Sequence, residues 1–233
     1  MAPHDTSRAP RGFFVTGTDT GVGKTLIACA LLHAFARAGW RVVGMKPVAA
    51  GAACSDEGLL NDDVAQLRAA GSVQAALRLV NPYCFEPAIA PHIAAAQAGV
   101  TIDIAHITQA CARLAAMADT VIVEGAGGFC VPLNRTQDTA DLAQHLGLPV
   151  ILVVGMRLGC MSHALLTAQA IRARGLRLAG WVANRIDPAM QVAGENVLAL
   201  AERLSSPLLG EVKFTPTPDA RHVATQFDLS RLA

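Results

Sequence analysis

Short apolar runs alternate with longer, alanine-rich apolar stretches along most of the chain. The runs that favour strands are residues 13–16, 41–45, 120–124, 150–154, 178–183 and, more weakly, 208–210. The stretches that favour helices are residues 26–38, 104–117, 140–146, 164–174 and 195–204, and Gly39, Gly147 and Gly175 supply stop signals after three of them. Because the strand runs are apolar throughout, we expect burial on both faces. The order predicts a three-layer α/β fold, a doubly wound and mainly parallel sheet flanked by helices.

A glycine-rich turn joins the first predicted strand to the first predicted helix. Residues 17–25 read GTDTGVGKT. In such a loop, backbone N–H groups face phosphate oxygens, the lysine neutralises the β- and γ-phosphates, and the threonine hydroxyl ligates Mg²⁺. The strict pattern G-x-x-x-x-G-K-[ST] is not met, since Thr18 stands five places before Gly23 and the glycine comes one residue earlier. The alternative is a plain turn with Lys24 in solvent, but both flanks favour a nucleotide triphosphate site.

Polar side chains stand at the carboxyl ends of three predicted strands, the edge where open α/β sheets bind ligands. Lys46 follows residues 41–45, Glu124 closes residues 120–124, and Asn184 follows residues 178–183. A carboxylate at the tip of a buried strand needs a partner, and a metal ion on nucleotide phosphates is an apt one. Asn184 could read an adenine edge. The plainer alternatives are a surface cation for Lys46, a helix cap or ion pair for Glu124, and a turn residue for Asn184.

Two further carboxylates, Asp62 and Asp63, follow Asn61 near the start of a helical stretch. One of the two could cap that helix, and the other could bind Mg²⁺ directly or through water. By composition, residues 49–58 are expected to form a mobile loop, and residues 215–218 open a less regular tail.

Composition narrows the classes of function. At 233 residues we expect one α/β domain over 1–233, with residues 1–11 as a flexible N-terminus. Hydrophobic residues make up 52% and charged residues 16%, against about 25% charged in an average domain, so we expect apolar surface to be buried in an oligomer. A net charge of +1 and 4% aromatic residues disfavour nucleic-acid binding.

The cysteines and the N-terminal segment bear on the compartment. The six cysteines form no C-x-x-C pair and have no histidine at ligand spacing, so we expect neither a zinc site nor disulfides. Residues 1–11 lack the apolar core of a signal peptide, and no apolar run approaches the roughly 20 residues that span a bilayer. We therefore expect a cytoplasmic protein with no membrane partner.

The sequence resembles the dethiobiotin synthases, ATP-dependent cyclo-ligases of biotin synthesis with a P-loop NTPase fold. The resemblance covers residues 14 to about 211, and the extra residue in the phosphate loop is itself a trait of this family. It rests on residues 14–20 (FVTGTDT), 23–25 (GKT), 46–49 (KPVA), 57–59 (EGL), 81–83 (NPY), 91–93 (PHI), 123–128 (VEGAGG), 158–160 (LGC) and 180–184 (GWVAN).

The resemblance implies a reaction of 7,8-diaminononanoate, CO₂ or bicarbonate, and MgATP to give dethiobiotin, ADP and phosphate. One amine forms a carbamate, which is phosphorylated to a carbamic-phosphoric anhydride, and the second amine closes the ring. The implied catalytic residues are Lys24, which holds the phosphates, and Lys46, which stabilises the carbamate and the transferred phosphoryl group. The implied Mg²⁺ ligands are Thr25, Asp63 and Glu124.

The resemblance also implies two sets of binding residues and a homodimer. The ATP contacts are Gly21, Val22, Gly23, Lys24, Thr25, Leu26, Asp63, Glu124, Gly125, Ala126, Gly127, Asn184, Arg185, Lys213, Phe214 and Thr215. The diamine contacts are Thr20, Lys46, Ala50, Gly159, Cys160, Met161 and Ser162. The last four would hold the substrate carboxylate at a helix N-terminus across the dimer interface.

The chain departs from the family in three places. Ala50 stands where a hydroxyl residue commonly contacts the substrate, and residues 213–215 (KFT) stand where Pro-x-Leu usually borders the adenine. The tail beyond Pro216 lies outside the resemblance.

Two other classes compete with a dethiobiotin synthase. Partition-type switch ATPases typically carry an additional lysine near the start of the phosphate loop, and residues 17–22 contain none. Cobyrinate amide-forming ligases need a glutaminase domain, for which this chain has no room. Neither class explains Lys46 followed by Pro47 and Val48.

Overall fold

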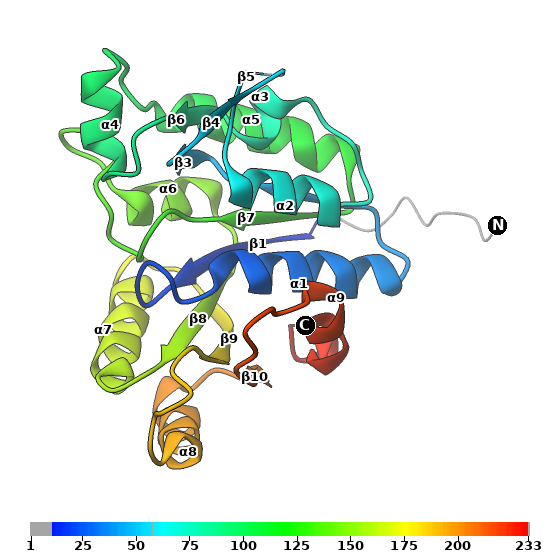
Figure 1. The fold of residues 1–233 in the computed structure, drawn as a ribbon, viewed down its shortest axis with the longest axis vertical. Helices are drawn as coiled ribbons and strands as arrows, with labels where there is room; N and C mark the ends of the chain where they lie inside the picture. Colours follow the sequence, from blue (N-terminus) through cyan, green and yellow to red (C-terminus); the bar gives the residue numbers. More distant parts are fainter. Residues whose placement is uncertain (1–10, 57, 233) are drawn as a thin grey trace.

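A six-stranded sheet forms the centre of the molecule. The structure is a computed structural model that describes residues 11–56 and 58–232. The strand order is β10-β9-β8-β1-β7-β2, and each neighbouring pair is parallel. These strands are β1 (Arg11–Gly17), β2 (Val42–Met45), β7 (Thr120–Glu124), β8 (Val150–Met156), β9 (Leu178–Arg185) and β10 (Leu208–Val212). The predicted doubly wound sheet is confirmed (Figure 1).

Helices cover both faces of this sheet. One apolar cluster contains α1 (Lys24–Arg37) and the short α9 (Ala220–Val223). The other contains α5 (Ile104–Met117), α6 (Thr139–Leu146), α7 (Cys160–Ala173) and α8 (Ala193–Leu204). Phe13 and Val15 of β1 belong to the first cluster, and Phe14 to the second. Since side chains alternate along a strand, only a continuously apolar β1 can serve both cores.

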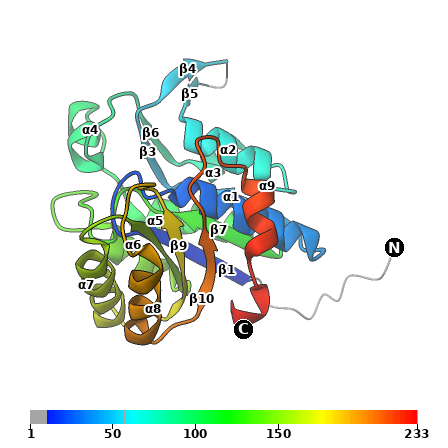
Figure 2. The same cartoon turned by 60° about the horizontal axis from the view of Figure 1, so that its bottom comes forward.

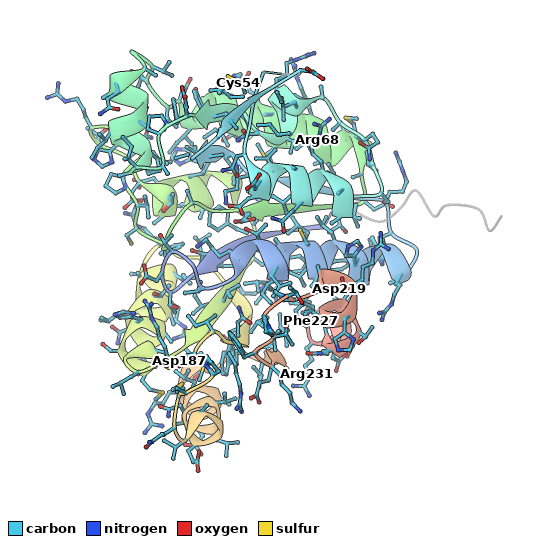
Figure 3. All side chains as sticks on the ribbon, viewed as in Figure 1. Cys54, Arg68, Asp187, Asp219, Phe227 and Arg231 are labelled. Atoms are coloured by element: carbon cyan, nitrogen blue, oxygen red, sulfur yellow. The ribbon has the colours of Figure 1, made fainter. Side chains whose placement is uncertain are left out.

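A second group of elements lies between β2 and α5 in the chain, on the side of the sheet that ends in β2. β3 (Val48–Ala50) pairs with β6 (Tyr83–Phe85), and β4 (Ala53–Ser55) pairs antiparallel with β5 (Gly58–Leu60). The remaining members are α2 (Asp62–Ala70), α3 (Leu77–Val80) and α4 (Pro91–Gln97). The β4–β5 hairpin projects from the body of the molecule (Figure 2), and Figure 3 marks Cys54 on it.

The segment expected to form a mobile loop, residues 49–58, contains regular structure, since the end of β3 and all of β4 lie within it. These strands are only three residues long and carry little apolar bulk, so their backbone pairing leaves no hydrophobic pattern to read. The hairpin is closed by the Ser55 hydroxyl, which donates to the Gly58 carbonyl oxygen at 2.6 Å.

Both ends of the described chain refine the predicted boundaries. Arg11, expected within a flexible terminus, is the first residue of β1, and residues 1–10 lie outside the described part of the chain. The tail is irregular as predicted. Beyond α9 it forms two 3₁₀ turns, Ala224–Gln226 and Leu229–Leu232, and α9 and the first of these pack against α1. Figure 3 marks Asp219, Phe227 and Arg231 along this segment.

Helix α7 begins at Cys160, four residues before the predicted start at 164. Gly159 precedes it in a left-handed conformation (φ 93°), and no side chain caps its first turn. A helix start without a capping residue gives no signal in the sequence, which explains the missed boundary.

The topology places a crevice at the carboxyl end of β1. From β1 the chain crosses to β2 at one edge of the sheet, and later strands extend the sheet on the other side through β8. Ligands of open α/β sheets bind where the strand order reverses in this way. The loops that leave β1, β2 and β7 meet at this point, and they carry the phosphate loop, Lys46 and Glu124.

Two expected absences concern the described residues. None of their helices combines the length and the apolar character needed to span a membrane. All six cysteines are free thiols.

Candidate active site

A cleft of about 770 Å³ opens at the carboxyl end of β1, within the usual range of about 300–1,000 Å³ for small-molecule sites. It brings together eleven of the residues expected from the sequence: Thr20, Gly21, Gly23, Lys24, Thr25, Lys46, Ala50, Asp63, Glu124, Ala126 and Gly127. Sequence reasoning gave no role to the others: Asp19, Val48, Ala88, Ile89, Ala90, Pro91, Gly128 and Val131. Four of these, Asp19, Val48, Pro91 and Gly128, belong to segments that resemble the family, and that resemblance was their only signal.

The phosphate loop is held closed by Asn184 at the end of β9. Its side-chain nitrogen donates to the Val22 carbonyl oxygen at 2.8 Å, and Asn184 is only 5% exposed. Gly23 adopts φ 90°, and a Cβ there would lie 2.2 Å from the same Asn184 nitrogen. Helix α1 therefore begins directly after a tight glycine, with no side-chain cap on its first N–H groups. Open N–H groups at a helix start favour an anion such as phosphate.

Lys24 and Asp19 shape the other wall of the loop. The Lys24 ammonium donates to the Asp19 carbonyl oxygen at 2.9 Å. The Asp19 carboxylate lies 2.5 Å from the Arg157 guanidinium, which ties the loop to the segment before α7. Burial lowers the pKa of Lys24 to about 8, although the charges of Glu124, Asp63 and Asp19 oppose this shift. The lysine is therefore charged at neutral pH but close to titration.

We expect MgATP affinity to fall as the pH rises through 8. Phosphates favour the charged ammonium, so above the free-protein pKa of about 8 binding must take up a proton at Lys24. Relative to pH 7, the Kd should rise about twofold at pH 8 and about tenfold at pH 9. Calorimetric titration of MgATP at each pH measures this. A Kd that stays constant from pH 7 to 9 would contradict it, and Lys24→Arg, which remains charged, is the control.

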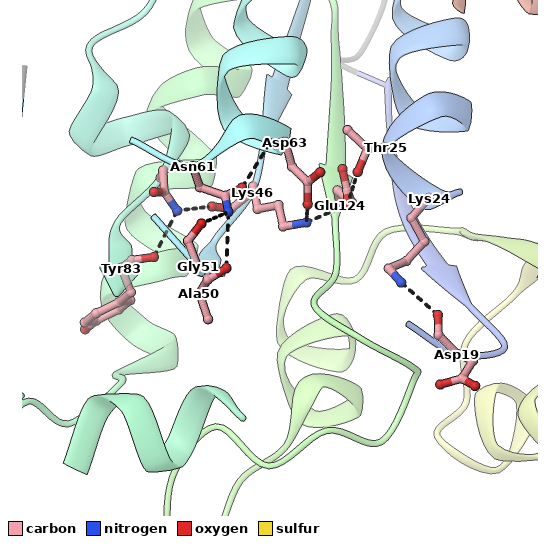
Figure 4. Close-up of polar contacts among 11 residues, drawn as sticks. Asp19, Lys24, Thr25, Lys46, Ala50, Gly51, Asn61, Asp63, Tyr83 and Glu124 are labelled. Atoms are coloured by element: carbon pink, nitrogen blue, oxygen red, sulfur yellow. Dashed lines mark hydrogen bonds and ion pairs between the residues drawn. The ribbon is translucent and has the colours of Figure 1, made fainter. Parts of the chain in front are cut away.

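A second cluster forms around Lys46 (Figure 4). Its ammonium nitrogen lies 2.5 Å from Asp63 Oδ2 and 2.7 Å from Glu124 Oε1. The Thr25 hydroxyl donates to the same Glu124 oxygen at 2.9 Å. Glu124 is 1% exposed, and its other oxygen, Oε2, is buried with no hydrogen-bond partner among the described residues. Residues from α1, β7 and α2 thus meet around one lysine.

The charges in this cluster stabilise one another. Burial alone would lower the pKa of Lys46, but Glu124 and Asp63 outweigh it and raise the pKa above its ordinary value. Burial raises the pKa of Glu124, and Lys46 opposes that rise. For Asp63, burial acts upward but Lys46 holds the pKa below its ordinary value. The Lys46 side chain therefore carries its positive charge throughout the neutral pH range.

Two asparagines, Asn61 and Asn81, position the cluster around Lys46. The sequence alone did not indicate this role for either of them. The Asn61 side-chain oxygen accepts from the Asp63 N–H at 3.0 Å and caps α2, so the expectation that Asp62 or Asp63 caps this helix is wrong. Asn61 precedes the helix in extended conformation, which allows its short side chain to reach back. Asp63 lies in the first turn, where the helix dipole favours a carboxylate and its side chain is free for Lys46.

Asn81 holds the backbone of Lys46. Its buried side-chain nitrogen donates to the Lys46 carbonyl oxygen at 2.6 Å and to the Tyr83 carbonyl oxygen at 2.9 Å. Asn81→Ala removes both of these buried hydrogen bonds, so we expect the free energy of unfolding to fall by about 2 kcal/mol in urea titrations. Asn196→Ala in α8, which removes one exposed hydrogen bond to the Val192 carbonyl oxygen, is the matched control. A loss no larger than that of the control would contradict this role.

The residues at this site fit a magnesium ion carried by a nucleotide. Among the described residues no group of three or more His, Cys, Asp or Glu side chains could hold a metal ion. Thr25, Asp63 and Glu124 supply a hydroxyl and two carboxylates, and the unpartnered Glu124 Oε2 leaves acceptor capacity unused. Mg²⁺ binds proteins in this way, through one or two carboxylates, with phosphate oxygens and water in the remaining positions.

The chain is similar to known proteins over nearly its whole length. A family model described as an AAA domain matches residues 11–221. This chain is 60% identical over 220 residues to the ATP-dependent dethiobiotin synthetase of Aromatoleum aromaticum, and the match covers 94% of this chain and 98% of that one. The corresponding protein of Nitrosospira multiformis is 57% identical over 95% and 96% of the two chains. The chain belongs to the ATP-dependent dethiobiotin synthetase family. It is therefore a ligase.

A solved structure shows the same fold at low identity. The MinD cell division protein of Aquifex aeolicus matches with a TM-score of 0.56 at 17% identity, covering 88% of this chain and 83% of that chain. At this identity the likeness concerns the fold alone, and it confirms the expected P-loop NTPase architecture.

Several residues that the family resemblance assigns lie outside the cleft lining. Three are packed within the fold or directly behind the cleft: Val22, Leu26 and Gly125. Asn184 donates to the phosphate loop, and Arg185 pairs with Glu211 of β10 through a bond of 2.6 Å from Nε. Contact of Asn184 with adenine stays a prediction. Two further groups are also absent from the lining: Lys213, Phe214 and Thr215, all exposed, and Gly159, Cys160, Met161 and Ser162 at the start of α7.

Proposed function

We propose that this chain converts 7,8-diaminononanoate, CO₂ and MgATP into dethiobiotin, ADP and phosphate. One substrate amine adds to CO₂ to give a carbamate, the γ-phosphoryl group moves to a carbamate oxygen, and the second amine displaces phosphate to close the ring. The observation that carries this proposal is the pair of buried lysines in one cleft, Lys24 on the phosphate loop and Lys46 at the end of β2. A phosphoryl transfer between two anions needs cations on both.

Each side chain has a defined part in this proposal. Lys24 and the N-terminus of α1 bind the β- and γ-phosphates, and Lys46 neutralises the carbamate oxygen that accepts the phosphoryl group. Thr25, Asp63 and Glu124 would hold Mg²⁺, which when bound neutralises charge on the phosphates. Thr20 lies between the two reactants. Ala50 supplies no hydroxyl, so any polar contact at that position of the substrate comes from backbone.

The same proposal includes a cytoplasmic homodimer built from the single domain 1–233. Leu158 is 95% exposed directly before the uncapped start of α7, and Leu166 of the same helix is 60% exposed. In α4, Ile93 is 44% exposed. Apolar side chains this exposed favour an interface. In a dimer, residues 159–162 of one copy would complete the diamine site of the other.

Leu158→Glu should convert the dimer to a monomer and abolish turnover, because a carboxylate would be buried in the interface without a partner. The fold should be unaffected, since Leu158 contributes almost nothing to the core. Sedimentation of both proteins at the assay concentration checks this. A monomeric wild-type protein that is fully active would contradict the dimeric site.

The reaction itself is tested by incubating the pure protein with the diamine, bicarbonate and MgATP. We expect ADP and the cyclic urea in equal amounts, and neither product in the absence of the diamine. ADP formed equally well without the diamine would contradict a ligase and favour an ATP hydrolase. Reactions without bicarbonate, under CO₂-free gas, are the matched control.

A further inference from the structure

We propose that Lys46 is a displaceable counter-ion for the metal site, so that binding of the metal–nucleotide complex releases its ammonium toward the carbamate. This inference rests on the proposed function. It concerns the order in which two cations use one pair of carboxylates. The geometry around Glu124 is what requires a choice between them.

The ammonium of Lys46 occupies oxygens that the metal would need. It lies 2.5 Å from Asp63 Oδ2 and 2.7 Å from Glu124 Oε1. Glu124 Oε1 also accepts the Thr25 hydroxyl at 2.9 Å, so all three candidate metal ligands contact Lys46 or its partner oxygen. A divalent cation at these ligands would stand within a few ångströms of a buried ammonium, and such like charges repel strongly.

Burial makes it unfavourable for the Lys46 ammonium and a divalent cation to occupy these positions at the same time. Lys46 is 6% exposed and Glu124 1% exposed, so water screens the repulsion poorly. Both carboxylates are already neutralised in part by Lys46, which weakens their attraction for free Mg²⁺. A nucleotide complex differs because its phosphates bring further negative charge, which offsets the repulsion.

The Lys46 side chain can move away from the carboxylates while its backbone stays in place. Its backbone is fixed by Asn81 and by the Lys46 N–H, which donates to the Val80 carbonyl oxygen at 2.8 Å. Its stem of four methylene groups is intrinsically flexible, and Lys46 is among the residues that line the open cleft. Moving only the side chain would turn the ammonium from the carboxylates toward the accepting substrate. The Lys46 ammonium thus stays paired with the two carboxylates until the phosphoryl donor has bound.

Metal binding without nucleotide tests this directly, with Mn²⁺ as the probe followed by electron paramagnetic resonance. We expect Lys46→Met to bind one Mn²⁺ at least about tenfold more tightly than the wild-type protein, because two carboxylates lose their counter-ion. The matched control is Lys24→Met. This variant also removes a buried cleft cation, but its hydrogen bond goes to the Asp19 carbonyl oxygen, and it acts on Glu124 and Asp63 only through space, so we expect a clearly smaller gain than in Lys46→Met.

An Mn²⁺ affinity of Lys46→Met no higher than that of the wild-type protein would overturn the inference. The assay contains neither diamine nor CO₂, so this result leaves the proposed reaction standing. If the wild-type protein binds no Mn²⁺ even with ATP, the metal site of the proposed function is wrong and the inference fails with it.

The wild-type protein offers a second measurement that does not depend on a variant folding. The chain has only three lysines, Lys24, Lys46 and the exposed Lys213, so labelled lysine side chains give three resolvable NMR signals. We expect the Lys46 signal, assigned with Lys46→Arg, to shift on addition of Mg²⁺ with a non-hydrolysable ATP analogue. A Lys46 signal unchanged at saturation would overturn the inference.

Discussion

Replacement of Lys46 by methionine should lower kcat by about 10³ without raising the Kd for MgATP by more than about threefold. In our account Lys46 acts on charge that develops on the carbamate and the transferred phosphoryl group, and removing one such group typically costs a factor of about 10²–10³. Lys46 contacts carboxylates rather than the phosphate loop, so the ATP site should survive. Single-turnover kinetics and nucleotide titration separate the two effects.

Lys24→Met is the comparison for this result. Lys24 belongs to the phosphate loop and contacts Asp19, so its loss should weaken MgATP binding together with turnover. If Lys46→Met raised the Kd for MgATP as much as it lowered kcat, Lys46 would be a second phosphate anchor. Circular dichroism is needed alongside, because the variant leaves two poorly solvated carboxylates without their cation.

Replacement of Gly23 by alanine should abolish MgATP binding at accessible concentrations, raising the Kd more than about 100-fold. The residue adopts φ 90°, which costs an L-residue roughly 1–2 kcal/mol, and the new Cβ would lie 2.2 Å from the Asn184 side-chain nitrogen. That nitrogen is not free to move, because it is buried and donates to Val22. The loop must therefore open, which displaces the N–H groups that face the phosphates.

Gly21→Ala distinguishes the effect of backbone strain from the effect of the steric clash with Asn184. Gly21 also has positive φ, at 74°, but a Cβ there meets no atom within 4 Å. We expect Gly21→Ala to weaken MgATP binding far less than Gly23→Ala does. The double variant Gly23→Ala with Asn184→Ala lacks the clashing side chain, so it should be thermally more stable than Gly23→Ala alone. Equal losses for both glycines would show that backbone strain alone matters and that Asn184 does not hold the loop.

The central sheet could be predicted because its physics is local. Strands such as β8, buried on both faces, must be apolar at every position, and this leaves a continuous pattern in the sequence. The strands β4 and β5 are three residues long and pair mainly through their backbones, so their side chains form no hydrophobic pattern that predicts them. The hydrophobic pattern missed the start of α7 for a similar reason, since Gly159 provides a turn but no capping oxygen, and only the family resemblance indicated a helix start at residues 159–162.

The candidate site was predictable in its members but not in its contacts. Strand-end placement brought Lys46 and Glu124 to one edge, and the phosphate loop supplied Lys24 and Thr25. That Lys46 sits directly on Glu124 joins residues 78 positions apart, a distance over which the sequence carries no geometric signal. The supporting roles of Asn61 and Asn81 were hidden likewise, because a buried asparagine and a turn asparagine look alike in a sequence.

The fate of the CO₂ oxygens distinguishes phosphorylation of a carbamate from hydrolysis of ATP. If the cleft phosphorylates a carbamate, the phosphate released on ring closure keeps one oxygen that came from CO₂. Turnover with ¹⁸O-labelled bicarbonate, stopped before the label exchanges with water, should therefore give inorganic phosphate containing one ¹⁸O atom for each ring formed. Phosphate without ¹⁸O beside stoichiometric ADP would mean that ATP is cleaved by water, and this would contradict the account.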